Sequence, residues 1–152
     1  MLRKARVGDV KTIHRMINIS SRKGEMLPRS LMDIYGNLRD FFVYLSEDGT
    51  MIEGTCAMSI IWENLAEVRS LYVDEDYRHR GIGRKLVEAC ISEAIILQLF
   101  RIFTLTRKPE FFLHLGFKEV NRSTLSEKIW SDCFHCSKYP DFCDEVAMVV
   151  DL

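Results

Sequence analysis

The chain has 152 residues, the size of one domain, and such a domain buries roughly two thirds of the surface that its unfolded chain exposes. Lys and Arg together (21) nearly balance Asp and Glu (22), so no overall charge points to nucleic acid or an anionic membrane as a partner. The N-terminus lacks the apolar region of a signal peptide, and no apolar run approaches the ~20 residues that span a bilayer. We therefore expect a cytoplasmic protein that forms one domain over residues 1–152 and binds neither nucleic acid nor membranes.

The first half of the chain predicts two helices and four strands. Asp9 and Ser30 are suited to cap the two helices, because a side-chain oxygen at this position can accept from the free N–H groups of the first turn. The dipeptide Asp48-Gly49 separates two β-branched and aromatic runs and favours a tight hairpin turn. The predicted elements are a strand at 2–7, a helix from 10 to about 23, a short helix over 31–38, a hairpin over 41–62 and a strand at 66–73.

The strand at 66–73 carries two charged residues in its middle. Side chains alternate between the two faces of a strand, so Glu67 and Arg69 are expected to share a face. Simple alternation predicts one face with Glu67, Arg69, Leu71 and Val73, and the other with Ala66, Val68, Ser70 and Tyr72.

The second half predicts a helix of about four turns, a strand, a short helix and two closing strands. Residues 121–144 form a polar segment with cysteines that is too long for an ordinary connection, so we expect it to have a function or to be held in place. The order of elements is that of one mixed α/β domain. The predicted ranges are a helix from 82, a strand at 100–106, a helix over 110–115 that Gly116 ends, and strands at 117–120 and 145–150.

A basic turn with two glycines, DEDYRHRGIGRK, precedes the helix that begins at Ile82. The first turn of a helix leaves its N–H groups free and adds about half a positive charge, and Gly81 and Gly83 let the backbone approach a ligand closely. The turn therefore predicts an anion site, with an ordinary helix N-terminus under solvated arginines as the alternative. Side chains that can contact phosphate oxygens are Arg78, Arg80, Arg84 and Lys85.

This turn, placed between the strand at 67–73 and a helix, resembles the acetyl-CoA motif of the GNAT N-acetyltransferases, and residues 111–117 resemble the second motif of that superfamily. The resemblance implies a GNAT domain with a mixed, mostly antiparallel sheet of about six to seven strands and about four helices. It implies acetyl-CoA as cosubstrate, with the pyrophosphate on the backbone of 79–84 and the pantetheine along 71–73, beside a splayed neighbouring strand. The implied cofactor-binding residues are Leu71, Tyr72, Val73, Arg78, His79, Arg80, Gly81, Ile82, Gly83 and Arg84.

A narrower resemblance points to the short bacterial acetyltransferases related to N-acetylglutamate synthase, which acts in arginine biosynthesis. It rests on residues 24–30, 66–71, 105–107 and 128–136 and implies L-glutamate as the acceptor. Glutamate carries two carboxylates, and the arginine fork matches carboxylate geometry. By this resemblance Arg29 and Arg107 would bind the carboxylates, with Arg69 as a third candidate; the alternative for each is a structural ion pair.

Acetyl transfer to an ammonium group requires removal of a proton, and Glu67 is the candidate general base, against the alternative of a salt bridge to Arg69. Backbone N–H groups near 71–73 would meet the oxyanion. Many GNAT enzymes carry a tyrosine acid where this chain has Phe112, which cannot donate a proton. We assign no group to protonate the departing thiolate. Water can do so, or a hydroxyl group, for which the candidates are Tyr72, Ser123 and Tyr139.

Five cysteines are an odd number in a chain without a secretion signal, so we expect free thiols at Cys56 and Cys90. Cys133, Cys136 and Cys143 have part of the spacing of a zinc site, but the alternatives of a disulfide and of packed thiols stay open, and we assign no metal.

The leading hypothesis is direct transfer of acetyl from acetyl-CoA to the α-amine of L-glutamate. The alternatives are another amino acid, a small amine or a protein N-terminus as acceptor, and a non-catalytic acetyl-CoA-binding module, an alternative that the missing tyrosine leaves open. The sequence is compatible with a homodimer but does not determine the oligomeric state.

Overall fold

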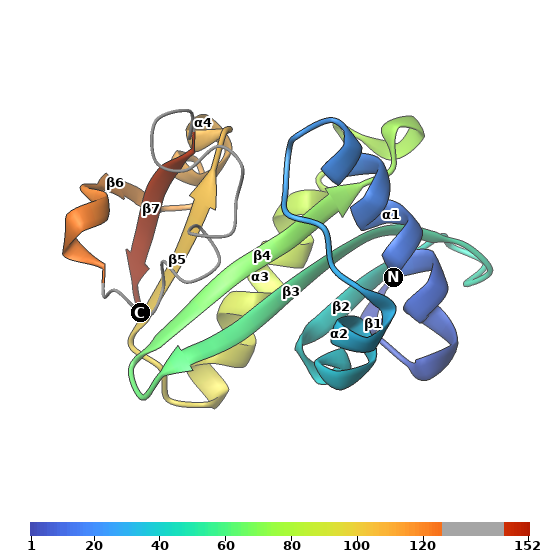
Figure 1. Cartoon of the computed structure of the whole chain (residues 1–152), viewed down its shortest axis with the longest axis horizontal. Helices are drawn as coiled ribbons and strands as arrows, with labels where there is room; N and C mark the ends of the chain where they lie inside the picture. Colours follow the sequence, from blue (N-terminus) through green and yellow to red (C-terminus); the bar gives the residue numbers. More distant parts are fainter. Residues whose placement is uncertain (126–144) are drawn as a thin grey trace.

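The computed structural model describes residues 1–125 and 145–152. These residues form a seven-stranded sheet in the order β1-β2-β3-β4-β5-β7-β6 (Figure 1). Only the central pair, β4 and β5, is parallel, and the other neighbours are antiparallel. The strands are β1 (Leu2–Lys4), β2 (Phe41–Leu45), β3 (Ile52–Trp62), β4 (Leu65–Val73), β5 (Arg101–Thr106), β6 (Lys118–Val120) and β7 (Val146–Asp151).

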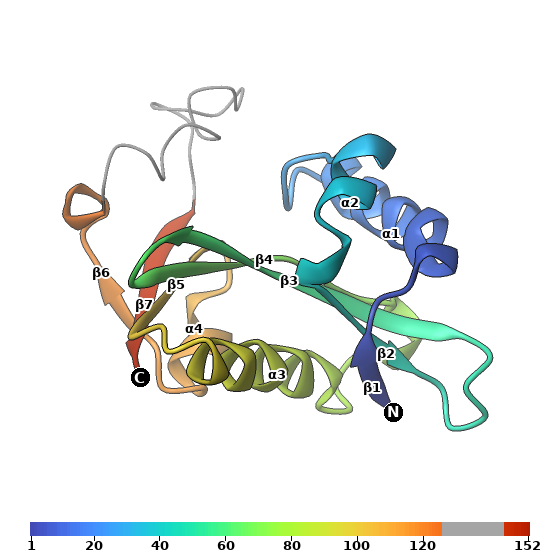
Figure 2. The ribbon, with the colours of Figure 1, turned by 90° about the horizontal axis from the view of Figure 1, so that it is seen from below.

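Helices cover both faces of the sheet. Helices α1 (Val10–Arg22) and α2 (Leu31–Gly36) lie on one face, and α3 (Ile82–Ile96) and α4 (Pro109–Leu113) lie on the other (Figure 2). The predicted element order, the mostly antiparallel sheet and the shared face of the first two helices are confirmed. Among the helices of the described ranges, none combines the length and the apolar character that crossing a bilayer requires.

Each face of the sheet has its own core because side chains alternate along the strands. On β2, Phe41 and Val43 pack with Ile13 and Ile17 of α1, whereas Phe42 packs into the core under α3. The α3 core also contains Cys56 and Cys90, whose thiols are buried and free, with their sulfur atoms 3.7 Å apart. The prediction of free thiols at these two positions is confirmed, whereas Cys133, Cys136 and Cys143 lie outside the described residues.

The two predicted helix caps have different outcomes. Ser30 caps α2 as predicted, because its Oγ accepts the N–H of Asp33 at 3.0 Å. Asp9 occupies the residue before α1, but its side chain makes no cap there. Its carboxylate instead accepts from the guanidinium of Arg3 at 2.7 Å and from the N–H of Arg6 at 2.7 Å, so the prediction of a side-chain cap was wrong.

A β-bulge interrupts β4 and overturns the simple alternation predicted for it. Arg69 lies opposite Ala57 and Tyr72 lies opposite Thr55, so two residues of β4 face one residue of β3. The first of the two is Ser70, whose φ of 56° is left-handed. The extra residue shifts the alternation by one position. Leu71 and Val73 therefore pack against the α3 core together with Ala66 and Val68, not on the face of Glu67 and Arg69.

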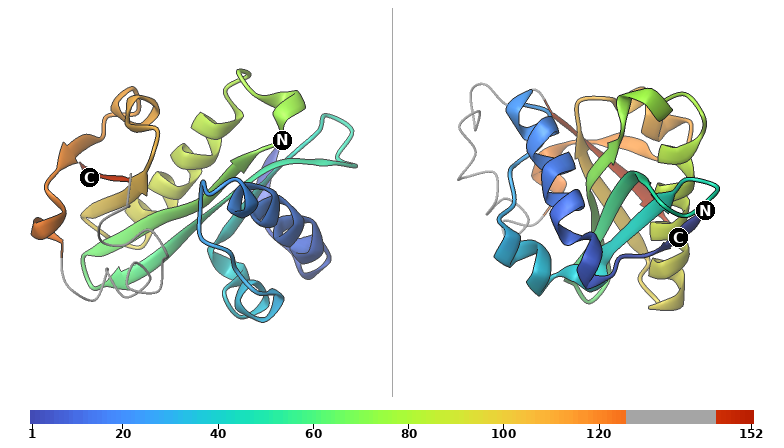
Figure 3. Two further views of the ribbon diagram at one scale, coloured as in Figure 1. Left: turned by 45° about the horizontal axis from the view of Figure 1, so that its top comes forward. Right: turned by 90° about the vertical axis from the view of Figure 1, so that its right-hand side faces the viewer.

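Strands β4 and β5 diverge after a short paired segment. Their register covers only Leu65–Glu67 with Arg101–Phe103, although both strands continue (Figure 1). At the divergence the Oγ1 of Thr104 donates to the carbonyl oxygen of Val68 at 2.9 Å, which satisfies one backbone group that has lost its strand partner. The splayed strand that the resemblance implies is thus present beside residues 71–73 (Figure 3).

Candidate functional site

A cavity of about 730 Å³ lies where β4 and β5 separate. Its walls come from the second half of β4, the end of β5, the turn before α3, helix α4 and the connection between α1 and α2. Cavities of this size between diverging elements are typical small-molecule sites.

The turn between β4 and α3 is shaped by two left-handed residues, His79 with a φ of 67° and Gly81 with a φ of 79°. Gly81 is the residue before α3, and it has no side chain that could cap the helix. The free N–H groups of the first turn and the dipole of this 15-residue helix can therefore hold an anion.

Arginines surround this turn and are held by specific contacts. The Nε of Arg78 donates to the carbonyl oxygen of Val73 at 2.9 Å and ties the turn to the end of β4. Arg84 pairs with Glu88 at 2.7 Å on the exposed side of α3. Arg80 lies over the ring of Tyr77 at 5.4 Å. Of the ten predicted cofactor-binding residues, all except Arg80 line the cavity.

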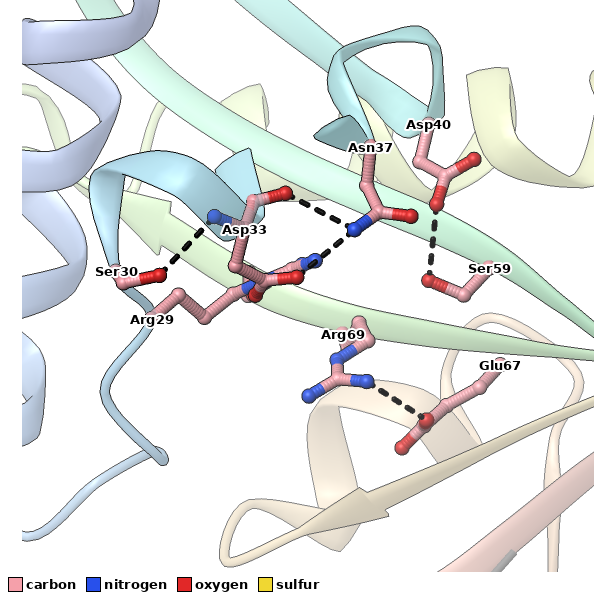
Figure 4. A network of polar contacts seen from close by, with 9 residues as sticks. Arg29, Ser30, Asp33, Asn37, Asp40, Ser59, Glu67 and Arg69 are labelled. Carbon is pink, nitrogen blue, oxygen red and sulfur yellow. Dashed lines mark hydrogen bonds and ion pairs between the residues drawn. The ribbon is translucent and has the colours of Figure 1, made fainter. Parts of the chain in front are cut away.

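The predicted acceptor residues divide into two groups. Glu67, Arg69 and Arg107 line the cavity, with the carboxylate of Glu67 3.8 Å from the guanidinium of Arg69. Arg107 also donates to the carbonyl oxygen of Gly24 at 3.2 Å, across the cavity mouth from β5. Strand alternation thus correctly placed Glu67 and Arg69 together, and they lie side by side in Figure 4.

Arg29 is not among the residues that line the cavity. Its side chain is 4% exposed, and its Nε forms an ion pair with Asp33 at 2.6 Å (Figure 4). Its guanidinium lies 4.9 Å from the ring centre of Phe41. The Nη1 of Arg29 reaches the Oγ of Ser70 at 3.4 Å, so Arg29 contacts a lining residue without lining the cavity itself.

Phe112 is buried in the cavity wall, where it cannot supply a proton. Tyr72 also lines the cavity, and burial, helped by the charge of Asp74, raises the pKa of its phenol. A phenol is protonated at neutral pH even without this shift, so Tyr72 has a proton to donate, although the raised pKa makes it a weaker acid. Ser123 is not among the lining residues, and Tyr139 lies outside the described residues.

Sequence reasoning missed the contribution of the α1–α2 connection. Lys23, Met26 and Leu27 line the cavity, and Lys23 forms an ion pair with Glu75 in the turn after β4. The signal was available in the segment 24–30, which the narrower resemblance includes, but there only Arg29 was considered.

Residues 37–119 match the family model described as an acetyltransferase (GNAT) domain, which is more than half of the chain. The chain belongs to the GNAT acetyltransferase family. It is similar to an uncharacterized N-acetyltransferase of Chlorobaculum tepidum, at 39% identity over 99% of this chain and 96% of the relative. It is also similar to an amino-acid acetyltransferase of Mycobacterium tuberculosis, at 30% identity over 91% of this chain and 79% of the relative.

Solved structures of GNAT proteins have the same fold. The crystal structure of Rv2747 from Mycobacterium tuberculosis, in complex with CoA and NLQ, has a TM-score of 0.88 at 25% identity and covers 100% of this chain and 99% of that one. N-acetylglutamate synthase from Neisseria gonorrhoeae, complexed with coenzyme A and N-acetyl-glutamate, also has a TM-score of 0.88, at 21% identity over 100% of this chain and 35% of that one. The GNAT protein described here is an acetyl-CoA-dependent acetyltransferase.

Proposed function

We propose that this GNAT enzyme acetylates the α-amine of L-glutamate and releases N-acetylglutamate and coenzyme A. The observation that carries the proposal is that Arg69 and Arg107 line the same cavity as the anion-binding turn before α3. Two guanidinium groups match the two carboxylates of glutamate. The names of the relatives, amino-acid acetyltransferase and N-acetylglutamate synthase, support an amino acid as the acceptor.

In this proposal the turn holds the pyrophosphate of acetyl-CoA. The backbone of 79–84 presents N–H groups to it, and Arg78 and Arg84 add charge at the rim. The pantetheine arm lies along residues 71–73, where β4 has no strand partner on the side of β5 among the described residues. The thioester then lies deep in the cavity, close to Glu67.

The acceptor enters beside the α1–α2 connection, and its carboxylates pair with Arg69 and Arg107. The ion pair with Asp33 occupies the Nε of Arg29, so a direct contact with the acceptor would have to use its Nη groups. We assign the two carboxylates to Arg69 and Arg107 because both line the cavity and Arg29 does not, and the acceptor KM of an Arg29 variant tests the alternative that Arg29 binds one of them.

The reaction requires a neutral amine. Glu67 accepts the proton of the α-ammonium, directly or through one water molecule, and the amine then attacks the acetyl carbonyl carbon. Backbone N–H groups of 71–73 stabilise the oxyanion that forms. The carbon–sulfur bond breaks, the positively charged nitrogen loses its second proton, and the coenzyme A thiolate takes a proton from Tyr72, which solvent then reprotonates, or from water. Starting from the ammonium form, the net change is one acetyl group moved to nitrogen, one proton gained by sulfur and one proton released to solvent.

A thiol-release assay with a panel of acceptors tests the proposal. L-Glutamate should give the highest kcat/KM. L-Glutamine should be weaker because it lacks the side-chain carboxylate, and L-aspartate should be weaker because its two carboxylates are closer together. A single acceptor of a different class, such as a polyamine or a peptide N-terminus, would contradict the proposed substrate. Coenzyme binding without any turnover would contradict an enzymatic role.

A further inference from the structure

The bulge in β4 places a serine in a conformation that favours glycine. In bulges of this kind two residues of one strand lie opposite one residue of the neighbouring strand, and the first of the two is left-handed and usually glycine. Here that position is Ser70, with a φ of 56°. A left-handed serine needs support from its surroundings, because its Cβ clashes with the backbone.

Arg29 provides such support from the opposite element. Its guanidinium crosses from the start of α2 to β4 and reaches the Oγ of Ser70 at 3.4 Å. The guanidinium is itself fixed, because Asp33 binds its Nε at 2.6 Å and Phe41 lies under it. Asp33 in turn accepts from the side-chain amide of Asn37 at 2.8 Å, and its N–H is held by Ser30, which caps α2 (Figure 4).

The bulge decides which way the following residues point. After the bulge, Leu71 and Val73 pack against the α3 core. Tyr72 lies between them in the strand and lines the cavity. A β4 without the bulge would turn these three residues to the opposite faces. The conformation of Ser70 therefore sets the geometry of the strand segment that borders the cavity.

We propose that Arg29 is a positioning residue for the acetyl-CoA site, acting through Ser70. It holds the left-handed conformation of Ser70 and so fixes the backbone of 71–73 against which the coenzyme lies. This inference rests on the proposed placement of the pantetheine arm, but not on the identity of the acceptor. Arg29 can play this role while its ion pair with Asp33 stays formed, because the contact with Ser70 uses its Nη1 and the ion pair uses its Nε.

The experiment combines R29Q with S70G. Glycine adopts the left-handed conformation without support, so S70G removes the need for the contact with Arg29. We expect R29Q to weaken coenzyme A binding, measured by titration calorimetry, by about tenfold, with a KM for the acceptor that changes less than about twofold. The double variant R29Q/S70G should bind coenzyme A about as tightly as S70G alone.

S70A tests the same contact from the other side, because it keeps Arg29 and a side chain at position 70 but removes the hydroxyl group that Arg29 contacts. It should weaken coenzyme A binding as R29Q does, and the two effects should not add. Because S70A leaves the ion pair of Arg29 in place, it also serves if R29Q fails to fold, as judged by thermal unfolding.

Three results would overturn the inference. The first is an R29Q variant with normal coenzyme affinity and a raised acceptor KM, which would make Arg29 a direct acceptor ligand. The second is weakened coenzyme binding that S70G does not restore. The third is an S70A variant with the coenzyme affinity of the wild type. Since coenzyme binding is measured without acceptor, a failure of glutamate as substrate would leave this test decisive.

Discussion

Phe111 of α4 lies so close to Gly83 of α3 that a Cβ atom at position 83 would be 3.3 Å from the Cζ of its ring. This contact brings α4 against the first turn of α3, and both residues line the cavity. Gly83 does not have a left-handed φ, so its small size, and not its backbone freedom, allows the contact.

The first prediction is that G83A weakens acetyl-CoA binding. The added methyl group displaces the ring of Phe111 and shifts the α3 amides that we propose to hold the pyrophosphate. We expect the KM for acetyl-CoA to rise by about three- to tenfold, with a smaller effect on the acceptor KM. Initial rates at varied acetyl-CoA and saturating acceptor measure it.

G8A is a suitable control, because a Cβ at Gly8 would have no atom within 4 Å and its φ is not left-handed. Its kinetic constants should equal those of the wild type. Equal acetyl-CoA KM values for G83A and the wild type would show that the packing of Phe111 on α3 has no influence on the coenzyme site.

The second prediction separates two neighbouring arginines. Arg84 lines the cavity, whereas Arg80 lies over the ring of Tyr77 and is not among the lining residues. We expect R84A to weaken coenzyme A binding by about tenfold, which corresponds to one charge-assisted contact with a phosphate oxygen, and R80A to change it less than about twofold. Titration calorimetry at low and high salt measures the effect, and the loss in R84A should shrink as salt rises.

The reverse order, with R80A the weaker binder, would mean that the pyrophosphate lies on the outer side of the turn. In that case the cavity lining would not identify the phosphate site. The two residues are matched in charge and side chain, so each variant serves as the control for the other.

Much of the fold could be predicted from periodicity and turn chemistry. Ser30 and the Asp48-Gly49 turn act locally, and the structure shows the cap and the hairpin that they predict. The turn before α3 could also be located from the sequence, because Gly81 directly precedes the helix; the anion site there stays a prediction.

The differences from the prediction arise from contacts between separate elements, which the pattern within one element does not show. Asp9 makes no side-chain cap on α1 because Arg3 on β1 binds its carboxylate. The bulge in β4 depends on the register against β3, so the sequence of β4 alone gave no sign of it. The ion pair of Arg29 with Asp33 and its contact with Phe41 could not be predicted either, and its role in acceptor binding stays a prediction.

The third prediction concerns Glu67 as the proton acceptor. E67Q keeps the shape of the side chain but cannot take a proton, so we expect kcat to fall by about a hundredfold or more. Initial rates with both substrates saturating measure it. An E67Q enzyme with a nearly normal kcat would leave Glu67 only as the ion-pair partner of Arg69.

The fourth prediction concerns Tyr72 as the proton donor. The phenol lines the cavity and is protonated at neutral pH, and Y72F removes the proton while keeping the ring. If Tyr72 protonates the thiolate, kcat should fall about tenfold to a hundredfold with little change in either KM. If kcat is unchanged, water protonates the thiolate and the ring of Tyr72 serves only as part of the wall.

The fifth prediction uses the ion pair between Asp9 and Arg3, which ties α1 to β1. The hydrogen bond from Arg3 is the main cause that lowers the pKa of Asp9 below its usual 3.8. A lowered pKa in the folded state means that the pair stabilises the fold above about pH 4 and that this contribution is lost as the pH falls through the lowered pKa.

D9N should therefore reduce the free energy of unfolding by about 1 kcal/mol at pH 7. The difference from the wild type should vanish near pH 2. Urea unfolding across this pH range measures it. D151N, at the exposed pair with Arg101, is a control that should change stability less than D9N does. A D9N variant as stable as the wild type at pH 7 would show that the β1–α1 junction does not depend on this carboxylate.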